Sequence, residues 1–151
     1  MKIELKILNL NLLQNSFFYA TSGSAGLDLR ACIETNTLEL SPRQSFLIPT
    51  GIAIHIEDPA YMGIIAARSN IGISRNIILT NGIGIIDSDY QGEIFLPVMN
   101  ISNKNIAIIF QLERLAQLII VPIRKIEFNF VDKFSTATPR GIGGFGSTGR
   151  D

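Results

Sequence analysis

The sequence predicts an all-β sandwich or barrel, and three observations carry this prediction. Short runs rich in Ile, Leu, Val and Phe recur along the chain. Breaks typical of tight turns separate them, as at Ser41-Pro42-Arg43, Asp58-Pro59 and Asn81-Gly82. Almost nothing has the pattern of a long amphipathic helix. The expected strands are 3–8, 46–49, 52–56, 62–66, 77–79, 94–99, 106–110, 115–121 and 127–130, with one short helix beginning near Ser69, whose hydroxyl is expected to cap it.

Length and composition limit the possible functions. A chain of 151 residues suits one domain with a single core. Thirteen basic and thirteen acidic residues give no net charge, which argues against a general nucleic-acid binder. No segment has the ~18 uninterrupted apolar residues of a membrane span, and no signal peptide is apparent. Cys32 is the only cysteine, so a cytoplasmic location is expected.

The last stretch of the chain differs from the rest. Residues 136–151 are rich in glycine and poor in aliphatic side chains, so they contribute little core. We therefore expect a folded domain at 1–135 and a flexible lid of the same domain at 136–151. The run Gly141–Gly146 matches GxGxxG, but no strand–helix unit surrounds it, so a dinucleotide site is rejected.

A polar loop between two strand-like runs is the first candidate for chemistry. Asp87 and Asp89 lie in the segment 84–92. Short carboxylates in a turn often bond nearby backbone N–H groups, which is one reading of both residues. The other reading is a general base, because an ionised Asp can take a proton from an attacking water.

Three further polar groups have both a structural and a functional interpretation. Arg68 and Ser69 suit phosphate oxygens, or are a surface arginine and a helix cap. Gln117 interrupts an apolar run and needs a partner if buried. Asp28 is either a strand-end carboxylate or associated with a metal. His55 lies in an alternating strand, so nucleophilic triads have no support.

Taken together, these clusters resemble the homotrimeric dUTPase family over essentially the whole chain. Five family motifs occur in order: Ser24–Arg30 (SAGLDLR), Ala67–Asn70 (ARSN), Asn81 with Gly84–Gly92 (GIIDSDYQG), Glu113–Gln117 (ERLAQ) and Arg140–Gly149 (RGIGGFGSTG). The resemblance implies a jelly-roll-like subunit, a homotrimer with shared active sites, and hydrolysis of dUTP to dUMP and pyrophosphate. That activity would supply dUMP for thymidylate synthesis and keep uracil out of DNA.

The resemblance also implies a role for each matched residue. Asp87 would be the catalytic base for water attack on the α-phosphorus. Mg²⁺ would span the triphosphate, with Asp28 touching the metal through water. The residues implied to bind substrate are Arg68, Ser69, Asn70 and Gln117 at the phosphates, Asn81, Ile85, Ile86, Tyr90 and Phe95 around the nucleoside, and Arg140, Phe145, Gly146, Ser147 and Thr148 in the lid.

Three positions depart from the family pattern, and two other functions remain open. Ala67 stands where Pro is usual, and Asn70 and Leu112 where Gly is usual. Asn70 matters most, because glycine allows closer backbone approach to a phosphate. The alternatives are a related dCTP deaminase and a non-catalytic nucleotide-binding regulator. The intact hairpin at 86–90 and the glycine-rich tail favour the diphosphatase over both.

Overall fold

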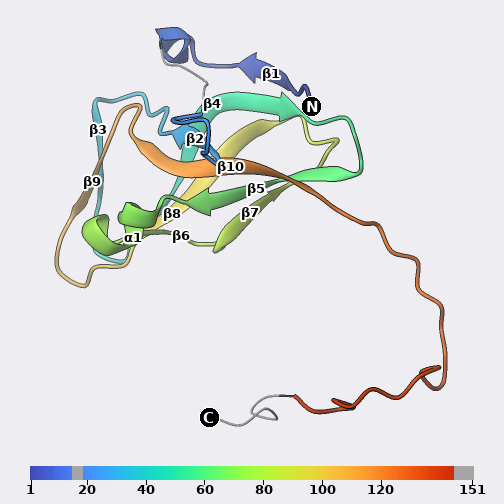
Figure 1. The fold of residues 1–151 in the computed structure, drawn as a ribbon. Coiled ribbons are helices and arrows are strands. Elements are labelled where there is room, and N and C mark those ends of the chain that lie inside the picture. The colour runs from blue at the N-terminus through green and yellow to red at the C-terminus, as the bar shows by residue number, and fades with distance from the viewer. Residues whose placement is uncertain (15–18, 145–151) are drawn as a thin grey trace.

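The computed structural model describes residues 1–14 and 19–144 and confirms the all-β, jelly-roll-like prediction (Figure 1). The described strands belong to three antiparallel sheets, and both helices are short. The elements are β1 (Glu4–Ile7), η1 (Leu10–Gln14), β2 (Leu27–Arg30), β3 (Thr37–Leu40), β4 (Ser45–His55), β5 (Tyr61–Ala67), α1 (Ser69–Arg75), β6 (Ile77–Leu79), β7 (Ile83–Ile86), β8 (Glu93–Asn100), β9 (Ala107–Phe110) and β10 (Arg114–Pro122). Within the described segments no helix is long and apolar enough to cross a membrane.

The sheets enclose one core of aliphatic side chains. The strand orders are β1-β4-β8-β6, β2-β10-β5-β7 and β3-β9. In β8, Ile94, Leu96 and Val98 are buried and alternate with more exposed residues, as a strand with one face on the core requires. Buried Leu29, Leu115 and other aliphatic residues of the second sheet belong to the same cluster. The core therefore fixes the second sheet, whose strand ends carry the candidate site.

The structure corrects several strand predictions. Strands β2 and β3 were missed because Asp28, Arg30 and Glu39 break the apolar pattern. Strand β7 was missed as well, because most of it falls in the segment 84–92 that was interpreted as a loop. The separate runs 46–49 and 52–56 form the single strand β4, which is irregular between Pro49 and Ala53. Gly51 lies there at φ +70°. Residues 127–130 were predicted as a strand but have no ladder partner and are exposed.

The connection around Asp87 is also different from a simple hairpin. Strand β7 pairs with β5, whereas β8 pairs with β4 and β6. The segment 87–92 therefore carries the chain from one sheet to the other. This crossing leaves room for a pocket between the two strands.

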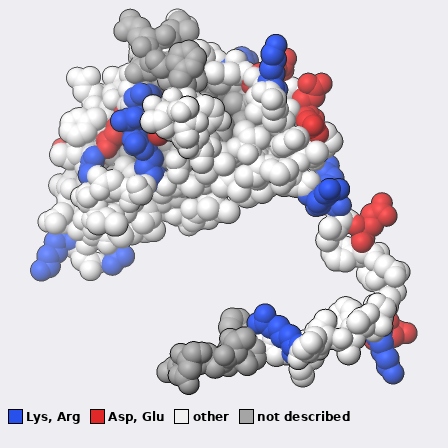
Figure 2. All heavy atoms as spheres, viewed as in Figure 1, with Lys and Arg blue, Asp and Glu red and all other residues white. Residues whose placement is uncertain are grey.

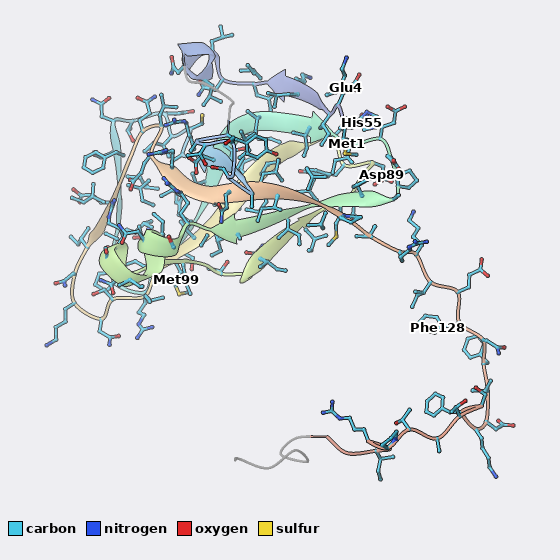
Figure 3. The ribbon with its side chains drawn as sticks, in the orientation of Figure 1. Met1, Glu4, His55, Asp89, Met99 and Phe128 are labelled. Atoms are coloured by element: carbon cyan, nitrogen blue, oxygen red, sulfur yellow. The ribbon has the colours of Figure 1, made fainter. Side chains whose placement is uncertain are left out.

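After β10 the chain leaves the body as an extended tail (Figure 1). Phe128 lies on this tail, clear of the sheets in Figure 3, and is 77% exposed. Hydrogen bonds within residues 124–144 are local, such as the one from the Gly141 N–H to the Thr138 carbonyl at 3.0 Å. The described part of the tail thus lacks a core of its own.

Candidate active site

A cavity rich in arginine lies where β5, β2 and β10 approach one another. It has a volume of about 420 Å³ and is lined by Arg30, Arg68, Ser69, Asn70, Ile71, Arg75, Leu112, Glu113 and Arg114. Four arginines line the cavity, whereas the nearby carboxylates are those of Glu113 and the neighbouring Asp28, so positive charge is in excess. Figure 2 shows basic and acidic side chains gathered on the body near the start of β10. Such a surface suits an anion with several oxygens.

The start of α1 brings Arg68, Ser69 and Asn70 to this arginine cavity. Arg68 is the N-cap residue, with φ −69° and ψ 144°, and no side chain caps the helix. The predicted Ser69 cap is therefore wrong, because Ser69 is already the first helical residue. Asn70 is not among the residues with positive φ, so the substitution for glycine costs no left-handed strain. Its side-chain Oδ1 instead accepts a hydrogen bond from Ser74 Oγ at 2.6 Å.

Strand register places Asp28 and Gln117 side by side on one face of the second sheet. Gln117 pairs with Asp28 on β2 and with Ala66 on β5. Arg68 comes two residues after Ala66, so it starts from the same face. No hydrogen bond to the Gln117 amide occurs within the described residues. The side chain is only half-buried, so the partner that a buried amide would need is not required. The amide is consequently available to a ligand.

Ion pairs fix the walls of the arginine cavity. Asp28 Oδ1 lies 3.3 Å from Arg68 Nε, and Asp28 Oδ2 accepts a hydrogen bond from Arg114 Nη1 at 3.0 Å. On the opposite side, Arg75 donates to Glu113 Oε1 and to the Ile108 carbonyl. Glu113 Oε2 accepts from the Phe110 N–H at 2.9 Å. These contacts tie α1 to the turn before β10.

The departure at Leu112 has a visible structural consequence. Leu112 has φ +60°, the left-handed conformation in which glycine is unstrained. Its carbonyl accepts a hydrogen bond from Arg30 Nη1 at 2.9 Å, and its N–H donates to the Ala31 carbonyl at 2.7 Å. These bonds hold the turn despite the strain. Sequence reasoning did not assign Arg30, Arg75 or Arg114 to the site, although Arg30 and Arg114 lie inside the quoted motifs.

A second, more apolar cavity lies beside β7 and β8. It has a volume of about 330 Å³ and is lined by Leu47, Ile65, Asn81, Gly84, Ile85, Ile86, Asp87, Tyr90, Glu93, Ile94, Phe95 and Pro97. All six residues predicted from the hairpin motif and its returning strand are therefore brought together. Ile85 and Phe95 stay half exposed and present apolar surface to this cavity, which suits a planar ligand. The exposed Asp87 carboxylate has no partner among the described residues.

Tyr90 forms one edge of this apolar cavity. Its hydroxyl donates to the Glu93 carbonyl at 2.8 Å, which fixes the ring. A Cβ at Gly92 would lie 2.5 Å from the Tyr90 hydroxyl oxygen, so only glycine fits beneath the ring. The family motif ending in Gly92 thus has a packing reason in this chain.

Comparison with known proteins identifies the family. A model of the dUTPase family matches residues 14–149. The deoxyuridine 5'-triphosphate nucleotidohydrolase of Paraburkholderia xenovorans (strain LB400) is 49% identical over 150 residues, which are 99% of each chain. The protein of the same name from Laribacter hongkongensis (strain HLHK9) is 49% identical over 148 residues, 98% of this chain and 97% of that one. This chain belongs to the dUTPase family.

Solved structures agree with the membership of the dUTPase family. The dUTPase of Staphylococcus bacteriophage 80alpha with dUPNHPP superposes with a TM-score of 0.84 at 25% identity, over 98% of each chain. The dUTPase from phage phi11 of S. aureus, 21% identical over 90% of this chain and 99% of that one, shares the fold with a TM-score of 0.77. The alternatives of a dCTP deaminase and a regulator without turnover are not favoured by these matches.

The dUTPase family uses a divalent metal. The residues of this chain fit a metal ion that is held mainly by the substrate. No group of three or more His, Cys, Asp or Glu side chains that could hold a metal occurs within residues 1–14 and 19–144. Both oxygens of Asp28 already face arginines. A cation held mainly by substrate phosphates and contacted through water is compatible with this arrangement, since such ions keep several waters.

The lid residues of the dUTPase motif are only partly placed by the structure. Arg140 lies in the tail, where its Nε donates to the Gly143 carbonyl at 3.1 Å. Neither cavity described above includes Arg140. Phe145, Gly146, Ser147 and Thr148 lie outside the described residues. Their implied roles stay predictions.

Two other titratable side chains have no place in the site. Burial raises the pKa of the Cys32 thiol to about 11, so the thiol stays protonated and unreactive at neutral pH. His55 is the last residue of β4, and its Nδ1 lies 3.1 Å from Glu4 Oε2 of β1, at the edge of the first sheet (Figure 3). The prediction of a structural, half-exposed strand histidine is confirmed.

Proposed function

We propose that the chain hydrolyses dUTP to dUMP and pyrophosphate, with water attacking the α-phosphorus. The water oxygen bonds to phosphorus, and the bond from the α-phosphorus to the oxygen bridging to the β-phosphate breaks. The observation that carries the assignment of roles is the unpaired Asp87 carboxylate at an apolar cavity of nucleobase size. In the proposed reaction Asp87 accepts the proton of the attacking water.

The arginine cavity is the proposed site for the triphosphate. Arg68 approaches Asp28 with Nε, and neither of its Nη groups donates a hydrogen bond to a described residue, so both can donate to phosphate oxygens. The Ser69 hydroxyl, the Asn70 amide and the free Gln117 amide supply further donors. Mg²⁺ is the proposed metal, bound to the triphosphate and contacted by Asp28 through water, and it supplies charge neutralisation at the phosphates.

The apolar cavity is the proposed site for deoxyuridine. Ile85, Ile86 and Phe95 provide apolar walls, and Asn81 and the backbone of β7 and β8 provide hydrogen-bonding groups. A cytosine would leave some of these polar groups unpaired, which is costly when water is excluded. In a narrow slot the methyl group of thymine has no space. Tyr90 is proposed to pack on the deoxyribose.

The positions of the two cavities favour active sites shared between subunits. They have no lining residue in common. Ile86 pairs with Gly63, so five residue steps, about 17 Å of extended chain, separate the level of Ile86 on β5 from Arg68. Asp87 and Arg68 thus lie beyond opposite parts of one strand. A homotrimer in which one copy supplies Asp87 and another supplies Arg68 brings them to a single nucleotide.

The tail completes this proposal as a lid of the domain formed by residues 1–135. Segment 136–151 would close over bound dUTP, with Phe145 stacking on uracil and Arg140, Gly146, Ser147 and Thr148 covering the phosphates. Closure excludes water other than the nucleophile and aligns the reacting atoms. In the cell we propose a cytoplasmic enzyme that supplies dUMP for thymidylate synthesis and keeps uracil out of DNA, without nucleic acid or membrane partners.

The substrate is tested by measuring pyrophosphate release from dUTP, dCTP, dTTP and UTP, with Mg²⁺ and with EDTA. We expect release from dUTP in Mg²⁺ to exceed the others clearly. Ammonia release from dCTP would instead indicate the deaminase. Binding of dUTP without any product would indicate the regulator.

Sharing of the site is tested by subunit complementation. Asp87→Asn and Arg68→Gln homotrimers should each be nearly inactive. When the two variants are co-expressed, mixed trimers contain sites with both native residues, so activity should return. A mixture of the separately assembled trimers is the control. Activity that does not return in the co-expressed protein contradicts sites shared in this way, and sedimentation as an active monomer contradicts the trimer.

A further inference from the structure

The ion pairs around Asp28 depend on an irregularity in β10. Gln117 pairs with Asp28 and Ala116 with Leu29, but Arg114 pairs with Arg30. Leu115 is therefore an extra residue, a β-bulge. Without it, Arg114 would lie opposite Ala31 and would point to the other face of the sheet. The bulge places Leu115 in the core, where it is 1% exposed, and turns Arg114 to the face that carries Asp28.

Asp28 is consequently held between two arginines that contact different oxygens. Arg114 Nη1 donates a hydrogen bond to Asp28 Oδ2 at 3.0 Å, and Arg68 Nε lies 3.3 Å from Asp28 Oδ1. A carboxylate paired with a single arginine prefers two parallel bonds to the guanidinium fork. Such pairing with Arg68 would occupy donors that a phosphate needs. The arrangement in this chain avoids that competition.

We propose that Arg114 is a positioning residue for phosphate binding. It holds the Asp28 carboxylate so that Asp28 contacts only Nε of Arg68, and the two Nη groups of Arg68 stay free for the triphosphate. The role rests on the proposed function, because it requires Arg68 to bind phosphate. When Arg114 is removed, Asp28 rotates onto the Arg68 fork, and the affinity for nucleotide falls because Arg68 loses donors, although Arg114 itself lies at the wall of the same cavity.

The test is a double-mutant cycle read by calorimetry with α,β-imido-dUTP, whose bridging nitrogen resists hydrolysis. Arg114→Gln should weaken binding about tenfold in the native background, a typical size for coupled charged neighbours. In the Asp28→Asn background the same change should have almost no effect, since no carboxylate remains to capture Arg68. Measurements in EDTA as well as in Mg²⁺ separate this coupling from any contact of Asp28 with metal-bound water.

Conservative and control variants distinguish positioning from other roles. Arg114→Lys keeps a cation near Asp28 and should recover part of the affinity. Arg43→Gln removes a guanidinium that pairs with Asn103 away from both cavities and should not change binding. The melting temperature of Arg114→Gln should stay within a few degrees of the native value, and KM should rise more than kcat falls.

Three results overturn the proposal. If Arg114→Gln weakens binding equally in both backgrounds, Arg114 acts on the phosphates directly or through its charge. If the variant loses stability and kcat together while KM is unchanged, its role is structural. If it has no effect on binding, it has no role in positioning. Failure of the native protein to bind the analogue at all would instead refute the proposed function.

Discussion

Apolar side chains are buried in the body of this chain, which ends with β10, but exposed in the tail that follows it. In the body, Ile48 and Leu96 are 0% exposed, and the site residues are anchored on strands that this core holds. In the tail, Phe130 is 93% and Phe134 is 91% exposed. The described part of the tail thus buries none of its aromatic rings. The difference teaches that the body stabilises the fold by burying apolar side chains, whereas the described tail adds no core of its own.

The largest expected effect is the loss of kcat when the Asp87 carboxylate in the body is changed to an amide. Asp87→Asn removes the proton acceptor but keeps the size and polarity of the side chain, so kcat should fall by about 10²–10⁴-fold while binding of α,β-imido-dUTP persists. Steady-state kinetics and calorimetry measure the two quantities. Asp89→Asn is the matched control, because it also removes one negative charge from the same loop but lies outside the cavity. Near-normal turnover by Asp87→Asn would show that Asp87 is not the catalytic base.

Stability should respond to the same contrast between body and tail. Leu96→Ala leaves a cavity in the core, so the free energy of unfolding should fall by about 2–5 kcal/mol. Ile142→Ala removes a similar side chain from the tail, where it is fully exposed, and should change that free energy by less than about 0.5 kcal/mol. Urea unfolding followed by circular dichroism, at one protomer concentration, measures both. Equal losses would show that the tail is packed as tightly as the core.

Removal of the lid separates function from stability. A chain ending at Thr138 loses the glycine-rich segment but keeps every described strand, so it should fold and assemble normally. Its kcat should fall about 10²-fold, because closure no longer aligns the water and the α-phosphorus. Phe145→Ala should reproduce part of the loss in affinity, about 1–3 kcal/mol for one stacked base. A truncated enzyme with full activity would leave the segment as a tail without function.

Sequence patterns predicted the fold class and the site better than they predicted individual strands. The apolar run 94–99 identified β8, and the run after Asp58-Pro59 identified β5. The apolar pattern did not reveal β2, because Asp28 and Arg30 belong to the site and interrupt the apolar residues of the strand. The pattern also gave a false strand at 127–130, where alternation exists but no ladder partner does. A periodic pattern shows that a segment can pair, but it does not show with what.

Site geometry was predictable only where a motif was continuous in sequence. Residues 81–90 lie close together along the chain, and the structure places their predicted members around one cavity. Arg114 was missed, because the bulge at Leu115 decides which face it occupies and no simple alternation reveals a bulge. Arg75 reaches the site through the Glu113 ion pair, a contact between residues 38 positions apart. Such long-range pairs depend on packing, which a single sequence does not display.

The smallest expected effect concerns the sugar. Tyr90 is fixed by its hydrogen bond to the Glu93 carbonyl and by the bare backbone at Gly92, and the ring is 42% exposed toward the cavity opening. In Tyr90→Ala the space for a ribose 2′-hydroxyl opens, so the preference for dUTP over UTP, measured as the ratio of kcat/KM values, should shrink about tenfold. Tyr90→Phe is the control: it keeps the ring but loses the hydrogen bond, so it should keep most of the preference. If Tyr90→Ala discriminates as well as the native enzyme, the ring does not exclude ribose, and selection of the sugar must come from a part of the site outside the body, such as the closed lid.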